Sequence, residues 1–213
     1  MKFTDRREGG RKLTEQLADY AGRDNVIVLG LPRGGVPVAD EVAKRLNVPL
    51  DVLLVRKIGV PGQEELAMGA IASGGGRVLN EDILQSFAIS EEDIRKVEEE
   101  EREELERRER EFRGGREELD VRDKIVILVD DGLATGASMR AAVKAVKDLG
   151  PEEVIAAVPS AATDSAEALE KEADRVITVI TPEPYMAVGA WYEKFGQTND
   201  AEVKEILETA RKR

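Results

Sequence analysis

Five short runs of β-branched and aliphatic residues alternate with helical stretches along this chain. The runs are nearly continuous in apolar side chains, and they occupy residues 26–30, 51–56, 124–131, 153–159 and 175–180. Such runs are typical of strands that are covered on both faces, because half-exposed strands alternate apolar with polar residues. Helical patterns separate the runs, at residues 37–46, 138–149 and 164–173. This order predicts an α/β fold with a central, mostly parallel five-stranded sheet flanked by helices.

The two ends of the chain carry further helical patterns. A helix at residues 9–21 precedes the first strand, and an amphipathic helix at residues 200–213 ends the chain. A length of 213 residues is enough for one substantial domain with a buried core. We therefore predict a single domain over residues 1–213, with its core at about 22–180 and a C-terminal appendage at 181–213.

Aromatic residues are concentrated in this appendage. Trp191 is the only tryptophan, and Tyr185 and Tyr192 are two of the three tyrosines. Aromatic side chains gathered after the last strand indicate a small hood over the carboxyl end of the sheet. The alternative is that they pack the last helix onto the core.

Two stretches interrupt the alternation of strands and helices. Residues 68–79 predict a hairpin that turns at three consecutive glycines, residues 74–76. We interpret these glycines as a turn and not as a phosphate loop, because no helix with a lysine follows them. Residues 90–112 predict a long charged helix, in which Ser90 is the cap and Glu and Arg residues recur four positions apart.

The apolar stripe of this charged helix is thin. Its members are Ile94, Val97, Leu105 and Phe112. Glu101 and Arg108 interrupt the stripe. A solvated helix that lies across the domain is the favoured interpretation, and a helix that binds a partner or forms a dimer is the alternative.

Composition excludes several kinds of chemistry. The chain has neither Cys nor His, which excludes disulfides, thiolate nucleophiles, Ser-His-Asp triads and zinc sites built on these residues. Its 32 Lys and Arg residues against 44 Asp and Glu residues give a formal net charge of −12, so we expect no nucleic-acid partner. The charged fraction of 36% suits either a thermostable protein with surface ion pairs or a designed sequence.

The sequence also predicts a location. No apolar run approaches the roughly 20 residues that a membrane helix needs, and the first residues, MKFTDRREGG, lack the apolar segment of a signal peptide. We therefore expect a cytoplasmic protein with no membrane partner.

The segment IVILVDDGLATGASM carries the most informative motif. Its apolar strand ends in Asp130 and Asp131, and a short loop then leads to a helix that starts near Ser138. Ligands of open α/β sheets bind at the carboxyl ends of strands, and a helix N-terminus offers N–H groups that suit a phosphate. Thr135 and Ser138 add hydroxyl donors, and Gly136 lets the backbone approach a ligand closely. The two carboxylates can accept hydrogen bonds from sugar hydroxyls or face a cation, so the motif predicts a sugar-phosphate site.

This segment resembles the phosphoribosyl diphosphate (PRPP) signature of type I phosphoribosyltransferases. The resemblance is strongest over residues 26–162, and the stretches LPRGG and AVGAWYEKFGQ are most similar to a poorly characterised bacterial and archaeal branch of that family. It implies the type I phosphoribosyltransferase fold, with Asp130 and Asp131 binding the 2′ and 3′ hydroxyls of the ribose. It also implies a loop that binds the 5′-phosphate, and this loop comprises Ala134, Thr135, Gly136, Ala137 and Ser138.

Two further segments fit the same family pattern. Arg33, Gly34 and Gly35 follow the first strand, where the family places a diphosphate-binding loop that often contains a non-proline cis peptide. The Pro32–Arg33 bond is the candidate by position.

Arg56 and Lys57 follow the second strand, beside the expected site of a highly anionic ligand. The resemblance favours diphosphate contact for this pair, although surface solubility is the alternative. We expect Arg56 and Lys57, together with Asp130 and Asp131, to be the catalytic residues. The next stretch, residues 58–79, occupies the position of the family's mobile catalytic loop.

The activity implied by the resemblance is Mg²⁺-dependent displacement of diphosphate from the ribose anomeric carbon by a nitrogen nucleophile. The expected partners are PRPP and a small nucleophile, most simply a nucleobase, and a homodimer is usual for such folds. The metal would be held indirectly, through PRPP and water, near Asp130 and Asp131. Ala134 stands where enzymes for 6-oxopurines carry Asp, which is more similar to an adenine-type loop. The alternative function is a non-catalytic regulatory protein that senses PRPP or a nucleotide.

Overall fold

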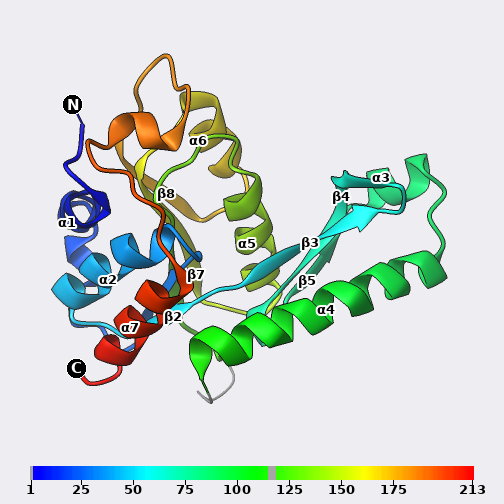
Figure 1. The fold of residues 1–213 in the computed structure, drawn as a ribbon, viewed down its shortest axis with the longest axis horizontal. Coiled ribbons are helices and arrows are strands. Elements are labelled where there is room, and N and C mark those ends of the chain that lie inside the picture. Colours follow the sequence, from blue (N-terminus) through cyan, green and yellow to red (C-terminus); the bar gives the residue numbers. More distant parts are fainter. Residues whose placement is uncertain (1, 115–118) are drawn as a thin grey trace.

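A five-stranded parallel sheet forms the centre of the computed structural model, which describes residues 2–114 and 119–213 (Figure 1). The sheet order is β2-β1-β6-β7-β8, and each neighbouring pair is parallel. Its strands are β1 (Val26–Gly30), β2 (Leu50–Val52), β6 (Ile125–Val129), β7 (Glu153–Ser160) and β8 (Arg175–Ile180). The prediction of an α/β fold with a parallel five-stranded sheet is confirmed.

Helices cover both faces of this sheet. Alternate residues of β1 belong to two different buried clusters. Val26 and Val28 are in the first cluster, whereas Ile27 and Leu29 are in the second. The first cluster contains residues of α1 (Arg6–Glu15), α2 (Gly35–Leu46) and α7 (Asp200–Ala210). The second cluster contains residues of α5 (Ala137–Lys147) and α6 (Thr163–Leu169). Because successive side chains of a strand point to opposite faces, each apolar run is buried on both sides, as its continuity predicts.

The predicted strand at residues 51–56 is wrong in its extent. The parallel strand β2 ends at Val52, and a new strand, β3 (Val55–Val60), begins after two residues. Leu53 N donates to Gly30 O, whereas Leu54 N donates to the side chain of Ser73. The chain thus leaves the parallel sheet here for a second sheet, and an apolar run alone does not show where its hydrogen-bond partners change.

The second sheet is antiparallel and has the order β3-β4-β5. Its other strands are β4 (Gln63–Ala72) and β5 (Arg77–Leu79), and a 3₁₀ turn at Ser73–Gly75 joins them. Gly74 and Gly75 have φ values of 77° and 86°, which glycine adopts without steric cost. The predicted hairpin is therefore confirmed, and residues 58–79 form strands and a turn in this structure. The sheet extends from the body of the molecule as an arm (Figure 1).

Helix α3 (Glu81–Ser86) and the long helix α4 (Glu91–Arg113) complete this arm. Ser90 caps α4 as predicted, since its Oγ accepts a hydrogen bond from Asp93 N at 3.1 Å. The helix runs along the second sheet and returns to the body beside α7 (Figure 1). In the described part of the chain, no helix combines the length and the apolar character needed to cross a membrane.

The N-terminal helix is shorter than predicted and starts earlier. Asp5 caps α1 by accepting from Glu8 N at 2.8 Å, so the helix begins at Arg6 and not at Gly9. The chain then forms a separate 3₁₀ turn at Ala18–Tyr20. Residues 181–199, which we call the hood segment, follow β8 and lead into α7.

Candidate functional site

The acid pair, Asp130 and Asp131, lies at the carboxyl end of the central strand β6. Asp130 Oδ1 accepts a hydrogen bond from Asp131 N at 2.8 Å. Asp131 Oδ2 accepts from Arg6 Nε at 2.8 Å, and both side chains are largely buried. Burial raises the pKa of Asp130 well above its usual value, and the Asp131 carboxylate adds to the rise. Burial also raises the pKa of Asp131, although the hydrogen bond from Arg6 opposes that rise.

Arg6 is a site residue that the sequence did not reveal. Besides Asp131, its guanidinium contacts Gly196 O at 2.6 Å and lies 3.9 Å from the centroid of the Phe195 ring. These contacts join the start of α1, the hood segment and the acid pair. Arg6 and Asp131 are 125 positions apart in the sequence, and no local motif connects them.

Gly34 and Gly35 bring the loop after β1, residues 31–35, against the acid pair. A Cβ atom on Gly34 would overlap Asp131 Oδ2, and one on Gly35 would lie 2.6 Å from Val129 O. Glycine is therefore required by close approach and not by an unusual φ. The Pro32–Arg33 peptide bond is cis, as expected from its position.

The segment after the acid pair, residues 134–138, comprises the turn before α5 and the first two residues of that helix. Gly136 is the N-cap of this helix and has a φ of 73°. Ser165 Oγ donates to Ala134 O at 2.5 Å, which fixes the start of the loop. Thr135, Ala137 and Ser138 are exposed. The first N–H groups of an α-helix have no acceptor within the helix, so this exposed helix start can receive an anion.

The hood segment lies over the carboxyl ends of β6 and β7. Tyr192 Oη donates to Asp131 O at 2.5 Å, and burial raises the pKa of this phenol, which keeps it protonated. Tyr185 Oη lies 2.9 Å from Ser160 Oγ, at the end of β7. Tyr192 also packs against Phe3 and Phe195. These contacts place the hydroxyl groups of Tyr185 and Tyr192 at the carboxyl ends of β7 and β6.

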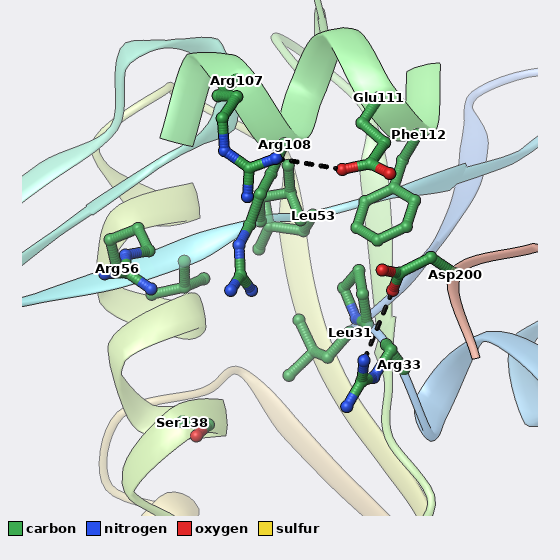
Figure 2. Close-up of a pocket in the computed structure, with 13 residues that line it drawn as sticks. Leu31, Arg33, Leu53, Arg56, Arg107, Arg108, Glu111, Phe112, Ser138 and Asp200 are labelled. Atoms are coloured by element: carbon green, nitrogen blue, oxygen red, sulfur yellow. Dashed lines mark hydrogen bonds and ion pairs between the residues drawn. The ribbon is translucent and has the colours of Figure 1, made fainter. Parts of the chain in front are cut away.

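A cavity of about 370 Å³ opens beside loop 31–35, and we call it the arginine cavity. Figure 2 shows its walls, which come from five parts of the chain. Arg33 and Ser138 belong to the two predicted anion loops, and Arg56 belongs to β3. Its remaining lining residues are Leu31, Pro32, Leu53, Leu54, Val55, Arg107, Arg108, Glu111, Phe112 and Asp200.

The arginine cavity does not include every predicted site residue. The acid pair, Gly34, Gly35 and residues 134–137 lie beside it and are not among its lining residues. Lys57 is exposed and follows Arg56 directly in β3, so its side chain points to the opposite face of the strand. The structure therefore brings Arg56 to the cavity and leaves Lys57 outside it.

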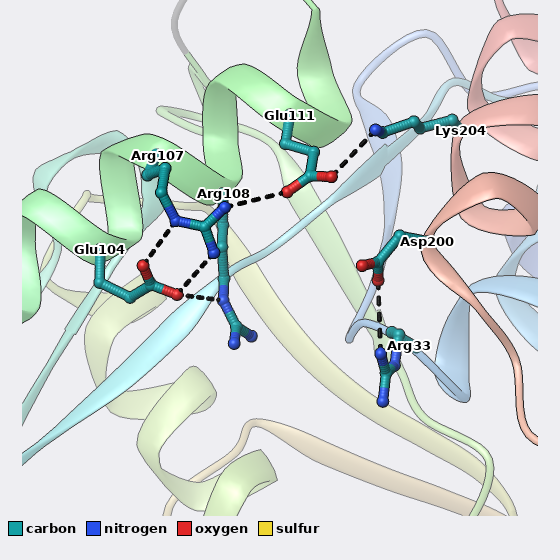
Figure 3. A network of polar contacts seen from close by, with 7 residues as sticks. All are labelled: Arg33, Glu104, Arg107, Arg108, Glu111, Asp200 and Lys204. Carbon is teal, nitrogen blue, oxygen red and sulfur yellow. Dashed lines mark hydrogen bonds and ion pairs between the residues drawn. The ribbon is translucent and has the colours of Figure 1, made fainter.

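Helix α4 contributes two arginines that the sequence analysis did not assign to the site. Arg107 and Arg108 share Glu104 as a partner, and Arg107 also pairs with Glu111 (Figure 3). One sequence signal does lead to this surface, because Glu101 and Arg108 are the residues that interrupt the apolar stripe of α4. In the structure Glu101 binds Arg56 at 2.6 Å and Arg108 lines the cavity.

The donor set of the site bears on metal binding. Among residues 2–114 and 119–213, no group of three or more acidic side chains is placed to hold a metal ion. The acid pair offers oxygen atoms of the kind that Mg²⁺ prefers, and Mg²⁺ usually keeps water and substrate oxygens as its other ligands. The site therefore fits a cation that arrives with a phosphorylated ligand, and it does not fit an all-protein cage.

Comparison with known proteins identifies the family of this chain. The family model of the phosphoribosyl transferase domain matches residues 4–193. Rv0571c of Mycobacterium tuberculosis H37Rv, whose name assigns it provisionally to the phosphoribosyl transferases, is 45% identical over 208 residues. That match covers 98% of this chain and 47% of the relative, so the chain spans about half the length of the curated relatives it matches first.

Two other relatives extend the comparison. The bifunctional protein PyrR of Clostridium acetobutylicum is 30% identical over 159 residues, which are 72% of this chain and 69% of that protein. The crystal structure of TT1426 from Thermus thermophilus has 43% sequence identity and a TM-score of 0.87. The match covers 97% of this chain and 98% of that chain.

Proposed function

The chain belongs to the phosphoribosyl transferase family, and on that premise we propose that it transfers the phosphoribosyl group of PRPP to a nitrogen nucleophile. The observation that carries this proposal is the meeting of three features at one edge of the sheet. These features are the buried acid pair, loop 31–35 with its close-packed glycines, and the exposed start of α5. An anion loop on each side of two carboxylates matches a sugar that carries a phosphate group at each end.

The ribose would lie over the acid pair. Asp130 and Asp131 would accept hydrogen bonds from its 2′ and 3′ hydroxyls. Residues 134–138 would bind the 5′-phosphate with backbone N–H groups and with the hydroxyls of Thr135 and Ser138. This placement assigns the same roles that the motif implies.

The diphosphate would lie toward loop 31–35 and the arginine cavity. Arg33 and Arg56 supply cationic donors there, while Gly34 and Gly35 let the backbone approach the ligand. Lys57 stays a prediction from sequence, and its exposed position gives it no contact with this cavity. The C–O bond to diphosphate would break with its electron pair on the departing oxygen, while the nitrogen lone pair forms the new bond to the anomeric carbon. Charge compensation at the diphosphate is therefore the main task of these residues.

Mg²⁺ fits this proposal as a companion of PRPP, since the acid pair provides hard oxygen donors and no complete cage. When bound, it would neutralise part of the diphosphate charge. Asp130 and Asp131 would hold it through water. We expect a nucleobase as the nucleophile, under the hood segment, and Ala134 favours an adenine-type base over a 6-oxopurine. A homodimer and a cytoplasmic location also stay predictions.

The ion pair between Arg6 and Asp131 favours a second candidate function. One of the two expected ribose-binding acids is already engaged by a cation at 2.8 Å. A protein that binds PRPP or a nucleotide without turning it over could use such a contact to report occupancy. Release of diphosphate from PRPP in the presence of candidate bases separates this regulatory role from catalysis.

The test of the proposed function is the rise in melting temperature caused by PRPP with Mg²⁺. The ligand-induced rise is compared between wild type and the double variant Asp130→Asn/Asp131→Asn. Asp19→Asn is the matched control, because Asp19 is exposed and lies before β1, at the opposite end of the sheet. We expect a clear rise for wild type and the control and a much smaller rise for the double variant. No rise for wild type at millimolar PRPP would refute the proposal.

A further inference from the structure

We propose that α4 supplies a second cationic group, Arg108, to the diphosphate of the ligand, opposite Arg33 across the arginine cavity. This inference rests on the proposed function and deepens it. It adds Arg108 as a binding residue and Glu104 as the residue that positions Arg108, both from outside the three motif loops. The chemical class recognised is a diphosphate, either within PRPP or free as the product.

The orientation of Arg108 is the first observation. Its Nε donates to Glu104 Oε1 at 2.8 Å, which uses the nitrogen nearest the helix. The two terminal nitrogens point away from the helix into the space above α5 (Figures 2 and 3). A guanidinium held in this way presents two donors to a phosphate in the geometry that favours paired hydrogen bonds.

The opposite wall of the cavity provides the complementary group. Arg33 Nη1 lies 3.5 Å from Asp200 Oδ1, at the start of α7, and this long contact leaves the guanidinium directed into the cavity (Figure 2). Ser138 lines the cavity at the start of α5. A ligand between these walls would therefore contact the guanidinium of Arg33 on one side and that of Arg108 on the other, and the hydroxyl of Ser138 at the start of α5.

Glu104 is the residue that positions Arg108. Two hydrogen bonds, the larger effect coming from Arg107 and the smaller from Arg108, lower the pKa of Glu104 to about 2, so Glu104 stays ionised at neutral pH. Arg107 uses Nε and Nη2 on Glu104 and Nη1 on Glu111. Each of the three guanidinium nitrogens of Arg107 is thus engaged within α4, whereas Arg108 is bound there through Nε and keeps both terminal nitrogens for a ligand.

The anchoring of α4 supports the same conclusion. Four arginines line the cavity together with two acidic residues, and Glu101 and Glu104 pair with Arg56, Arg107 and Arg108 from outside the lining. An anion would therefore depend on the terminal nitrogens of Arg33 and Arg108 and not on an excess of positive charge. The end of α4 is fixed to the body by the Arg113–Asp51 pair at 3.1 Å and by the Lys204–Glu111 pair at 3.0 Å. The wall that carries Arg108 is therefore held in place before a ligand arrives, which reduces the entropic cost of binding.

The experiment is calorimetric titration of inorganic diphosphate, and of PRPP, into wild type, Arg108→Gln and Arg110→Gln. Arg110 is the matched control, because its replacement removes the same charge from the same helix, its partner among the described residues is Glu106 at the surface, and its side chain is 71% exposed. We expect Arg108→Gln to weaken diphosphate binding at least tenfold, since charge-assisted hydrogen bonds are lost. We expect Arg110→Gln to stay within about twofold of wild type, as for an exposed pair.

A Glu104→Gln variant tests the positioning role. It keeps Arg108 and loosens its anchor, so we expect weaker diphosphate binding than in wild type but stronger binding than in Arg108→Gln. Arg108→Met removes the charge with little change in side-chain length, and it serves as a second probe if the Gln variant folds poorly, with the same expected loss of at least tenfold.

The outcomes separate this inference from the proposed function. If wild type binds PRPP and Arg108→Gln or Arg108→Met binds diphosphate as tightly as wild type, α4 has no role and the proposed function stands. Equal losses in Arg108→Gln and Arg110→Gln indicate a general charge effect and also overturn the inference. If wild type binds neither PRPP nor diphosphate, both proposals fail.

Discussion

A single methyl group at Gly35 tests the packing argument for the site. The Cβ of Gly35→Ala would lie 2.6 Å from Val129 O and 2.8 Å from Asp130 Cα, both of which are backbone atoms. Val129 O also accepts a hydrogen bond from Leu31 N at 2.9 Å, so the methyl group would push loop 31–35 off the end of β6. Overpacking of this kind costs about 1–3 kcal/mol. In a chain of this length that lowers the melting temperature by roughly 2–12 °C.

Gly34→Ala gives a contrasting result from the neighbouring position. Its Cβ would overlap Asp131 Oδ2, which is the end of a side chain that can rotate away. We therefore expect a smaller loss of melting temperature than for Gly35→Ala. The rotation would break the contact between Arg6 and Asp131, so we also expect weaker binding of PRPP.

The assay is thermal unfolding followed by circular dichroism, with PRPP binding measured on the same samples. Gly196→Ala is the control, because a Cβ there would have no atom within 4 Å and the residue has no left-handed φ. A Gly35→Ala variant that melts with wild type and binds PRPP normally would refute the claim that this loop is packed against the acid pair.

Three further predictions follow from buried charges. Because burial raises the pKa of Asp130, the folded state binds its proton more tightly than the unfolded state, and stability falls as pH rises above the unfolded pKa of roughly 3.9. We therefore expect Asp130→Asn to gain melting temperature over wild type progressively from pH 4 to pH 8. Arg6→Gln removes the hydrogen bond that opposes the raised pKa of Asp131, so Asp131 should ionise at a higher pH in this variant. PRPP affinity, measured by titration at several pH values, should therefore begin to increase at a higher pH than in wild type. Asp51→Ala removes a carboxylate that pairs with the buried Arg113, which keeps Glu109 as a partner at 3.7 Å, and urea unfolding should show a loss of about 1.5–3 kcal/mol.

Matched variants control these three predictions. Asp19→Asn should melt with wild type at every pH, because Asp19 is exposed. Arg7→Gln removes a charge from the same turn as Arg6 without a contact to Asp131, and its pH profile should follow wild type. Glu106→Gln breaks an exposed pair of α4 and should cost less than about 1 kcal/mol. Each argument is contradicted by a different outcome. For Asp130→Asn, it is a melting-temperature difference from wild type that does not change with pH. For Arg6→Gln, it is the same pH dependence of PRPP affinity as in wild type, and for Asp51→Ala, a loss of unfolding free energy no larger than that of Glu106→Gln.

The sequence predicted the parts of the fold that depend on local patterns. Continuous apolar runs located all five strands of the parallel sheet, and the Ser90 cap located the start of α4. The change of sheet after Val52 could not be predicted in this way, since Leu53 and Leu54 continue the apolar run. Their hydrogen-bond partners, Gly30 and Ser73, are set by the tertiary fold.

The same distinction applies to the site. The acid pair and loop 134–138 form one short motif, and the cis peptide at Pro32–Arg33 follows from its place in a second motif. Arg6 and Arg108 reach the site from distant helices, so only the folded structure brings them there. The polar interruption of the α4 stripe by Arg108 was visible in the sequence, but it could not show which surface the side chain faces.

Helix α4 packs on the second sheet and is fixed to the body at its C-terminal end, and these two sets of contacts restrict how the arm can change in length. An α-helix turns by about 100° per residue, so one residue inserted before Glu104 would rotate the half that packs on the second sheet relative to the half that carries Arg108. An insertion of seven residues, nearly two full turns, would restore the relative orientation to within about 20°. Homologous arms should therefore lengthen or shorten in steps of about seven residues, wherever both the second sheet and the cavity-facing arginine are kept.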